Sequence, residues 1–292
     1  MSLKTQKVPI YIRKLESLLR RLPKIHRKRG ESHGRSLAGF NGEKSLDYHL
    51  SFLDDKKYTI NNNLRLKGNK EYFYQLDLLI ISPYYFLIIE VKNISGTVFF
   101  NANTNQFVRI SSDKETGMLN PITQVERQKR QLSKHLKEHR LTHLPIETIV
   151  VISNQYTVIK TSSNHINISN SVIHSDDILN HLGKLGKRYS EEKITSKEIR
   201  KTSRILTKLN TPYNPDILQK FQISESELLK GDQCPRCQYI PMNRKTSKWT
   251  CSACSFTSKD AHHDAIKDYS LLVSSTITNQ ELRNFFSCPQ LQ

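Results

Sequence analysis

Acidic residues are in the minority in this chain of 292 residues. There are 27 Asp and Glu against 45 Lys and Arg, which leaves a formal net charge of +18. A folded protein with this excess is expected to bind a polyanion, and nucleic acid is the first candidate. Residues 1–35 hold 11 of the basic side chains and two acidic ones, although a single basic run is more often a solvated surface.

Long apolar runs are missing. No segment approaches the roughly 18–20 apolar residues that a membrane span needs, and the N-terminus lacks the apolar middle segment of a secretory signal. There is no internal repeat and no low-complexity tract. We therefore expect a cytoplasmic protein without a membrane span, large enough for one sizeable core and a smaller module. The oligomeric state is left open.

Cysteine is scarce, but four of the five cysteines form two pairs with the same spacing. Cys234 and Cys237 make one C-x-x-C pair, and Cys251 and Cys254 make the second. This pattern resembles a zinc ribbon and predicts one structural Zn²⁺ bound by four thiolates, rather than disulfides or redox pairs. A ribbon over residues 231–258 can bury little core, so metal binding would supply its folding free energy.

The chain has a single tryptophan, Trp249, which lies between the two cysteine pairs near Arg244. Basic groups around an aromatic ring can hold phosphates and stack a base, which makes Trp249 a candidate substrate-binding residue. The alternative is that Trp249 forms the small core of the ribbon. Two helical patterns follow, Ala265–Val273 and Asn279–Phe286, and predict a helical hairpin or half of a helix-turn-helix within residues 259–292.

The N-terminal part of the chain is amphipathic. Apolar residues recur at helical spacing among Arg and Lys over residues 8–22, which predicts a basic helix ended by Pro23. We expect this helix to pack against the protein, with DNA or a membrane surface as alternatives. Residues 1–35 would comprise the helix and a linker (24–35). The main domain then covers residues 36–183, and a connector covers 184–230.

The main domain alternates β-rich segments with helices. A first helix is expected over residues 39–53. A second begins at Asn120, which can cap it, and at Pro121, whose missing N–H is harmless in the first turn. The order predicts an α/β fold, a mixed sheet flanked by helices. Strands are expected at 58–66, 72–82, 85–92, 96–101, 105–111, 146–153 and 171–174, and a connector helix at 196–209.

Two neighbouring strands of this set carry charged residues within apolar runs. Asp77 lies on the first, and Glu90 and Lys92 lie two apart on the second, so they share a face. A turn at 82–84 would bring the strands side by side. Burying an unpaired carboxylate is costly, so such groups persist when they are paired or bind a metal. Two acids beside a lysine can hold a divalent cation and position a water for phosphodiester cleavage.

With two further motifs, these residues resemble the nuclease-related domain (NERD), a branch of the restriction-endonuclease-like PD-(D/E)xK superfamily. The resemblance covers about residues 36–155. The motifs, in the order of the family, are Gly39-Phe40-Asn41-Gly42-Glu43, Gln75-Leu76-Asp77, Glu90-Val91-Lys92-Asn93 with Gly96, and Asn120-Pro121-Ile122-Thr123-Gln124. The resemblance implies a restriction-endonuclease-like sheet and a Mg²⁺- or Mn²⁺-dependent nuclease, with DNA favoured over RNA as the substrate.

The resemblance also implies roles for single residues. Asp77 and Glu90 would bind Mg²⁺ or Mn²⁺, with the carbonyl oxygen of Val91 as a third ligand. Lys92 would orient or deprotonate the attacking water and offset charge on the scissile phosphate. Glu43 would complete the metal shell or hold Lys92. These four side chains are the predicted catalytic set.

Gln75 and Gln124 are implied as substrate-binding residues, with Gln75 bracing Asp77 and Gln124 contacting the nucleic-acid backbone. The alternative for Glu90 and Lys92 is a structural ion pair. The whole domain could then be a non-catalytic adaptor that binds nucleic acid in DNA processing. The motifs themselves do not select DNA or RNA, endo- or exonuclease cleavage, or a target sequence.

Overall fold

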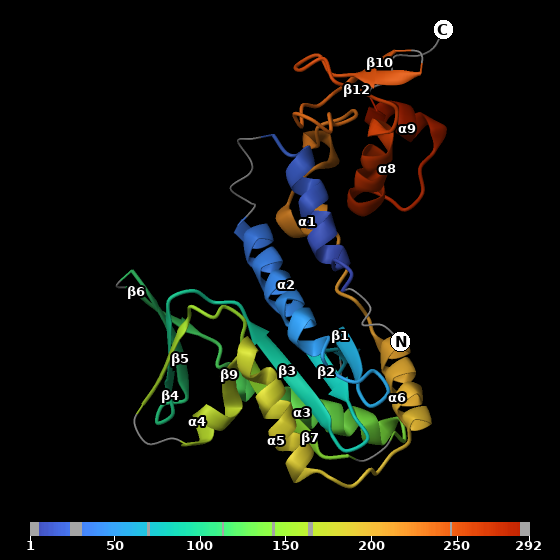
Figure 1. Cartoon of the computed structure of the whole chain (residues 1–292). Coiled ribbons are helices and arrows are strands. Elements are labelled where there is room, and N and C mark those ends of the chain that lie inside the picture. The colour runs from blue at the N-terminus through green and yellow to red at the C-terminus, as the bar shows by residue number, and fades with distance from the viewer. Residues whose placement is uncertain are drawn as a thin grey trace. The chain divides into compact units, whose positions relative to one another are not determined.

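The computed structural model in Figure 1 describes residues 6–23, 31–68, 71–112, 114–141, 144–162, 166–245 and 247–286. The chain divides into two compact units, residues 1–7 with 38–212 and residues 8–37 with 213–292. Each unit has hydrophobic clusters of its own. None of the helices in the described ranges is long and apolar enough to cross a membrane.

A five-stranded mixed sheet is the centre of the first unit. Its order is β1 (Thr59–Lys67), β2 (Phe73–Ile81), β3 (Phe86–Lys92), β7 (Ile146–Ile152) and β9 (Val172–His174). The first three strands are antiparallel neighbours, whereas β7 and β9 continue the sheet parallel to β3. Ser82 forms the predicted turn between β2 and β3, because its Oγ accepts hydrogen bonds from the N–H groups of Tyr84 and Tyr85.

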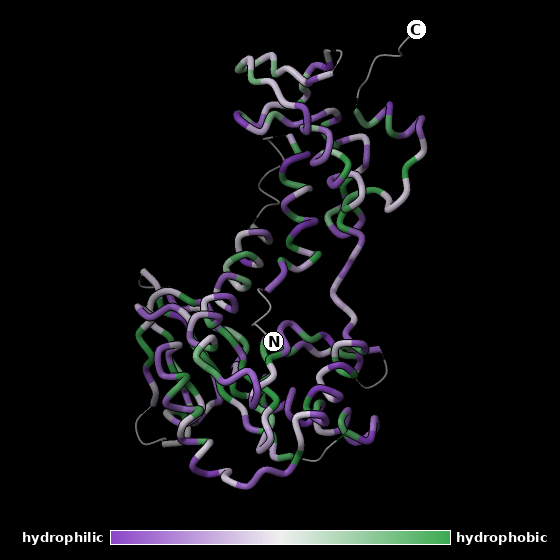
Figure 2. The backbone as a smooth tube through the Cα atoms, turned by 45° about the vertical axis from the view of Figure 1, so that its right-hand side comes forward, coloured by the Kyte–Doolittle hydropathy of each residue, from purple (hydrophilic) through white to green (hydrophobic). Residues whose placement is uncertain are grey.

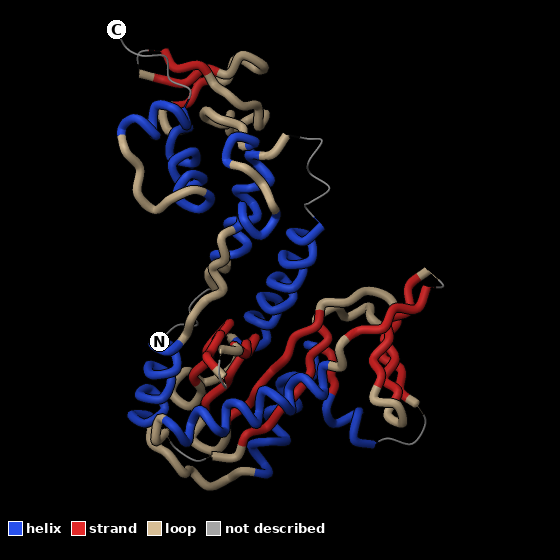
Figure 3. The backbone as a smooth tube through the Cα atoms, turned by 180° about the vertical axis from the view of Figure 1, so that it is seen from behind, coloured by secondary structure: helices blue, strands red, loops and turns tan. Residues whose placement is uncertain are grey.

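Helices cover both faces of this sheet, which is why β2 and β3 are apolar at almost every position. On one face, Leu46 and Leu50 of α2 (Glu31–Leu50) and Leu182 of α5 (Ile178–Arg188) join one hydrophobic cluster. On the other face lies α3 (Pro121–Glu138). Figure 3, which views the molecule from behind, shows this helix running across the strands. The connector helix α6 (Ser196–Leu209) packs against β1.

Helix α2 is longer than the sequence predicts. It begins at Glu31 instead of residue 39, so the second part of the predicted linker over 24–35 is helical. Residues 24–30 lie outside the described residues. The hydrophobic pattern could not reveal the longer helix, because residues 33–39 are partly or fully exposed and the first buried side chain is Phe40.

The strands of the first unit are split between two sheets. The second sheet has the order β6 (Lys114–Met118), β5 (Gln106–Ser111), β4 (Thr97–Asn101) and β8 (Val158–Thr161), and α4 (Ile166–Ser171) leads into β9. The predicted α/β class with helices flanking mixed strands is confirmed. Strands β6 and β8 were not expected, because they lack the apolar run that identifies a buried strand. Gly96 turns the chain from β3 into the second sheet. Its φ is +93°, and a Cβ there would lie 2.6 Å from the carbonyl oxygen of Ile110.

The basic N-terminal helix packs on the protein itself, as expected. Helix α1 (Ile10–Arg21) alternates hydrophobic and hydrophilic positions (Figure 2), and its Leu15 and Leu18 join a cluster with α7 (Ile217–Phe221) and α8 (Ala261–Leu272). Arg21 is fully buried, and its Nε donates a hydrogen bond to Asp268 Oδ2 at 2.8 Å. The first helix is therefore a structural part of the second unit.

The rest of the second unit contains a small antiparallel sheet and a helical hairpin. The sheet consists of β10 (Asn243–Lys245), β11 (Lys248–Thr250) and β12 (Thr257–Ser258). Helix α8 is followed by α9 (Asn279–Phe286), and the rings of Tyr269 and Phe285 meet edge to face with centroids 5.1 Å apart. This contact shows that the two helices pack on each other, which both predicted alternatives, a helical hairpin and half of a helix-turn-helix, require.

Candidate functional site

The candidate active site lies where β2 and β3 separate. Their backbone pairing runs from Ile81↔Phe86 to Leu78↔Ile89. Beyond the last backbone pair, side chains connect β2 and β3 in place of backbone hydrogen bonds. Asp77 Oδ2 accepts a hydrogen bond from the Val91 N–H at 2.9 Å, and Gln128 Nε2 donates to the Gln75 carbonyl at 2.9 Å. The opening between the strands is thus lined with polar groups.

Glu90 is almost fully buried at 2% exposure and accepts hydrogen bonds at both carboxylate oxygens. Its Oε1 is 2.7 Å from Lys92 Nζ and 2.6 Å from Gln124 Nε2. Its Oε2 is 2.8 Å from Gln128 Nε2. Lys92 Nζ also donates to Gln124 Oε1 at 3.2 Å. Three donors therefore compensate a carboxylate that would be very unfavourable in this position by itself.

Glu43 reaches this site because α2 comes unusually close to the ends of β3 and β7. A Cβ on Gly42 would lie 2.7 Å from Asn93 Cβ and 2.8 Å from Ser153 Oγ, so only glycine allows this approach. Asn93 Nδ2 also donates to the Ala38 carbonyl at 2.8 Å, which holds the helix in place. One oxygen of Glu43, Oε2, is buried without a hydrogen-bond partner among the described residues.

The carboxyl groups affect one another. Burial and the charge of Glu90 raise the pKa of Glu43 to about 7, against the opposing effect of Lys92. Burial, followed by the charges of Glu90 and Glu43, raises the pKa of Asp77 well above its usual range, although the Val91 N–H and Lys92 act in the opposite direction. Three carboxyl groups thus lie near one ammonium, that of Lys92. A divalent cation would reduce the remaining repulsion among the carboxylates.

These residues fit a divalent cation by their chemistry. They offer carboxylate oxygens, which Mg²⁺ and Mn²⁺ prefer, and one of these oxygens is buried and unpartnered. Among the described residues, the one set of three or more candidate ligands within 4.8 Å of one another is the four cysteines. The three acids are therefore less compact as a set, and a cation here would use two carboxylates at a time, which is usual for Mg²⁺.

The structure brings together most of the residues that the sequence singled out. Glu43, Asp77, Glu90 and Lys92 interact electrostatically, and Gln124 contacts two of them. Gln75 is different, because the residue is exposed and its main-chain carbonyl makes the contact with α3.

Gln128 was missed by the sequence analysis, although a signal was present. It is 3% exposed and lies four residues after Gln124. Between Val125 and Leu132, it occupies a position on the buried side of α3 where an apolar residue is expected. A polar residue at such a position indicates a buried partner, which here is Glu90.

The four cysteines of the second unit form a compact cluster. Sγ of Cys234 is 3.7 Å from Sγ of Cys254, and Sγ of Cys237 is 3.5 Å from Sγ of Cys251. A tetrahedral Zn²⁺ with bonds of about 2.3 Å requires sulfur–sulfur distances of about 3.8 Å. The cluster beside a small three-stranded sheet is consistent with the predicted structural zinc site.

The two cysteine pairs also have the same backbone turn. The N–H of Gln238 donates to the Cys234 carbonyl, and the N–H of Ser255 donates to the Cys251 carbonyl. Both Gln238 and Ser255 have a positive φ, 61° and 56°. Each turn directs two thiols to one point, so the local backbone supports the metal-ligand interpretation over four unrelated thiols.

Trp249 lies in the core of the ribbon. Its side chain is in the same cluster as Cys234 and Cys251 and is 7% exposed. His262 stacks on its ring with centroids 4.5 Å apart, and the guanidinium of Arg244 lies 5.2 Å from the ring centroid. These contacts favour the core interpretation, because they leave little of the ring for stacking a base.

A comparison with known protein families finds a match within the first unit. The profile of the family described as the nuclease-related domain, NERD, matches residues 38–153. This range contains the four acidic and basic residues of the site together with Gln124 and Gln128 of α3. No curated protein and no solved structure matches the chain.

Proposed function

From the premise that residues 38–153 form a nuclease-related domain, we propose that the protein is a metal-dependent nuclease of the PD-(D/E)xK type, with DNA as its first substrate to test. The observation that carries this proposal is the network in which Glu90 contacts Lys92 and Gln124 while the pKa values of Asp77 and Glu43 are raised. Clustered groups with perturbed pKa values favour a functional site over an isolated structural ion pair.

In this proposal Asp77 and Glu90 hold the Mg²⁺ or Mn²⁺ ion, and the Val91 carbonyl is the third protein ligand. When bound, the ion supplies an activated water and offsets negative charge at the scissile phosphate. Glu43, with its unpartnered oxygen, either completes the ligand set or accepts a hydrogen bond from Lys92.

Lys92 orients the attacking water and stabilises charge on the phosphate. Its ammonium lies 2.7 Å from Glu90 Oε1 and 3.2 Å from Gln124 Oε1, which uses two of its three N–H donors and leaves one for a water. Gln124 already contacts both Glu90 and Lys92. Its contacts favour a role in positioning these two side chains over the predicted contact with the substrate.

The zinc ribbon would assist in holding nucleic acid. Arg236 and Lys248 are exposed on the ribbon. Phosphate contacts from such residues add affinity without sequence preference. The structural Zn²⁺ would contribute by keeping this short segment folded.

The proposal is tested by incubating the purified protein with single- and double-stranded DNA and RNA, with Mg²⁺, Mn²⁺ or EDTA. Wild type is compared with Lys92→Ala and with Lys184→Ala, a matched control on the exposed side of α5. We expect metal-dependent cleavage by wild type and the control, reduced by at least about 100-fold in Lys92→Ala. Equal rates for wild type and Lys92→Ala under every metal condition would refute the nuclease.

One observation favours a second function, a non-catalytic adaptor that binds nucleic acid. Both oxygens of Glu90 are already engaged by protein donors, as in a structural ion pair. In that case nucleic acid binds, no metal increases cleavage, and Lys92→Ala lowers the stability of the fold without any loss of turnover.

A further inference from the structure

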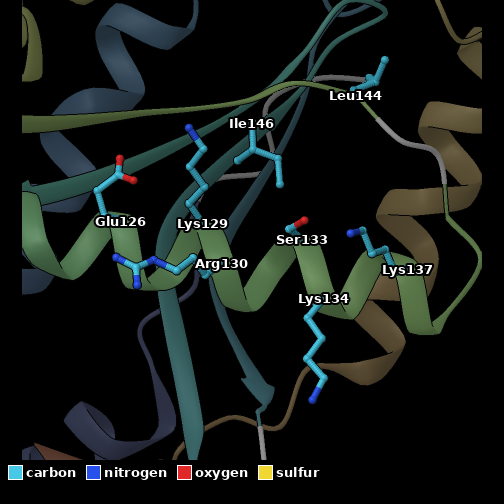
Figure 4. Close-up of a pocket in the computed structure, with 8 residues that line it drawn as sticks. All are labelled: Glu126, Lys129, Arg130, Ser133, Lys134, Lys137, Leu144 and Ile146. Carbon is cyan, nitrogen blue, oxygen red and sulfur yellow. The ribbon is translucent and has the colours of Figure 1, made fainter.

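A basic depression of about 520 Å³ lies beside α3, on the side facing the start of β7. Leu144 and Ile146 form its apolar wall (Figure 4). The remaining lining residues all come from α3 and are Glu126, Lys129, Arg130, Ser133, Lys134 and Lys137. The depression is therefore formed mainly by one helix, the same helix that supplies Gln124 and Gln128 to the acidic centre.

The positive charge of this depression is largely uncompensated. Helix α3 carries five Lys and Arg and two Glu. Glu138 pairs with Lys134 at 3.5 Å, and Glu126 accepts a hydrogen bond from Thr148. Within the described part of the chain, no carboxylate lies within 4.0 Å of the charged groups of Lys129, Arg130 or Lys137. These three cations are available to an anionic partner.

The arrangement of the basic groups suits a chain of phosphates. Lys129, Ser133 and Lys137 follow one another at intervals of four residues and therefore form a row along the helix. Figure 4 shows all three pointing to the side of α3 where Leu144 and Ile146 lie. With a rise of 1.5 Å per residue, the row is about 12 Å long. One strand of a duplex carries a phosphate about every 3.4 Å along the axis, so the row spans about three or four phosphates.

We propose that this depression binds the sugar–phosphate backbone of nucleic acid, with Lys129, Arg130 and Lys137 contacting phosphates. The inference rests on the proposed nuclease function, because a strand held along α3 lies on the helix that builds the acidic centre. A membrane surface is a poorer partner, since no exposed large hydrophobic side chain is among the lining residues. An acidic protein surface is the other competitor that the test has to separate.

The test uses the Lys92→Ala background with EDTA, so that the probe is not cut. One variant adds Lys129→Glu, Arg130→Glu and Lys137→Glu. The matched control adds Lys197→Glu, Lys201→Glu and Arg204→Glu on the exposed side of α6, with the same change in net charge. Binding of labelled single-stranded and duplex DNA of about 30 nucleotides is followed by fluorescence anisotropy between 50 and 200 mM salt, the range in which phosphate contacts dominate affinity. A second variant has Gln at the same three α3 positions. It removes the positive charges without adding acidic side chains, and so controls for misfolding of the Glu variant.

We expect the α3 reversal to weaken binding at least tenfold at about 100 mM salt and to reduce the salt slope by about 2–3, as the loss of three phosphate contacts requires. The Gln variant should lose part of this affinity, and the α6 control should lose less than threefold. Equal losses in the α3 and α6 variants would show a net-charge effect and overturn the proposal. Unchanged DNA binding by the α3 variant, with lost binding to polyglutamate or phosphatidylserine vesicles, would overturn it in favour of the other partners.

The result of this binding test can be distinguished from the result of the cleavage test of the nuclease proposal. In a chain that retains Lys92, the α3 reversal should raise the KM for cleavage. If wild type cuts no substrate but the α3 variant still loses DNA affinity and the control does not, the nuclease proposal fails while the binding surface stands.

Discussion

At the scale of single residues, the acids of the site have unequal environments. Glu90 is held by Lys92, Gln124 and Gln128, which fixes both of its oxygens. Glu43 has one buried oxygen without a described partner, and its pKa is raised to about 7. Glu90 is therefore positioned by the protein, whereas the raised pKa of Glu43 makes its charge sensitive to pH, and to a bound cation, near neutral pH.

Gln128→Leu tests the positioning of Glu90. The change removes one donor to a buried carboxylate, so we expect a loss of about 1–3 kcal/mol in the free energy of unfolding. If the nuclease proposal holds, kcat should fall more than KM rises. The control is Gln131→Leu, one turn further along α3 and partly exposed, which should change both quantities little. Urea denaturation and cleavage kinetics measure the two effects, and equal behaviour of the two variants would contradict the assigned role.

Glu43→Gln tests the raised pKa through stability. Because the pKa rises from 4.5 to about 7 on folding, the folded protein binds a proton that the unfolded chain has released between these values. The free energy of unfolding should therefore fall as pH rises through this window, by up to about 3 kcal/mol from Glu43 alone.

In Glu43→Gln this decline should be smaller, with a remainder from Asp77, whose pKa is raised in the same direction. Urea midpoints at pH 5 and pH 7.5, without added metal, give the comparison. The same decline in wild type and Glu43→Gln would show that Glu43 titrates normally in the folded protein.

At the scale of secondary-structure elements, the approach of α2 to β3 determines whether Glu43 reaches the site. Gly42 permits the contact with Asn93 and Ser153, and the Asn93 side chain holds the Ala38 carbonyl. Gly39, one turn earlier, has open space around its Cβ position. Close packing of α2 therefore requires a glycine at position 42 but not at position 39.

Gly42→Ala should displace α2 and be destabilising, because its Cβ would lie 2.7 Å from Asn93 Cβ. We expect a loss of about 1–3 kcal/mol in the free energy of unfolding, together with reduced cleavage. Gly39→Ala is the matched control and should stabilise the helix by up to about 1 kcal/mol. Thermal unfolding and activity of both variants provide the measurement, and similar effects of the two changes would contradict the close-contact argument.

At the scale of the whole molecule, the two units depend on different sources of stability. The first contains two extensive hydrophobic clusters, one on each face of its five-stranded sheet. The second has three smaller clusters, and its ribbon buries few apolar side chains besides Trp249 and Met242. We therefore expect the ribbon to need a bound metal for folding, whereas the sheet of the first unit has a large hydrophobic core of its own.

Metal analysis should find about one zinc per chain, which Cys234→Ser abolishes. Cys288→Ser is the control, since this cysteine belongs to neither C-x-x-C pair, and should retain the zinc. Removing zinc with a strong chelator should expose Trp249 and shift its fluorescence, because the ribbon loses its folding free energy. Full zinc content in Cys234→Ser would rule out a four-cysteine site.

Local patterns in the sequence were sufficient for much of the candidate site. The apolar runs identified β2 and β3, Asn120 and Pro121 marked the start of α3, and the C-x-x-C pairs predicted the cysteine cluster. Each of these signals comes from residues close together in the chain, where spacing alone determines which side chains share a face or a turn.

Tertiary structure decided what depends on distant residues. The separation of β2 from β3, the contact between Gln128 and Glu90, and the space left by Gly42 arise only when α2, α3 and the sheet pack together. The second sheet and the burial of α1 have the same origin, because weakly apolar strands and an amphipathic helix acquire their partners through long-range packing. The sequence by itself determined the chemical groups of the site, whereas packing decided which of them meet, because the contact energies depend on distances that the linear spacing does not specify.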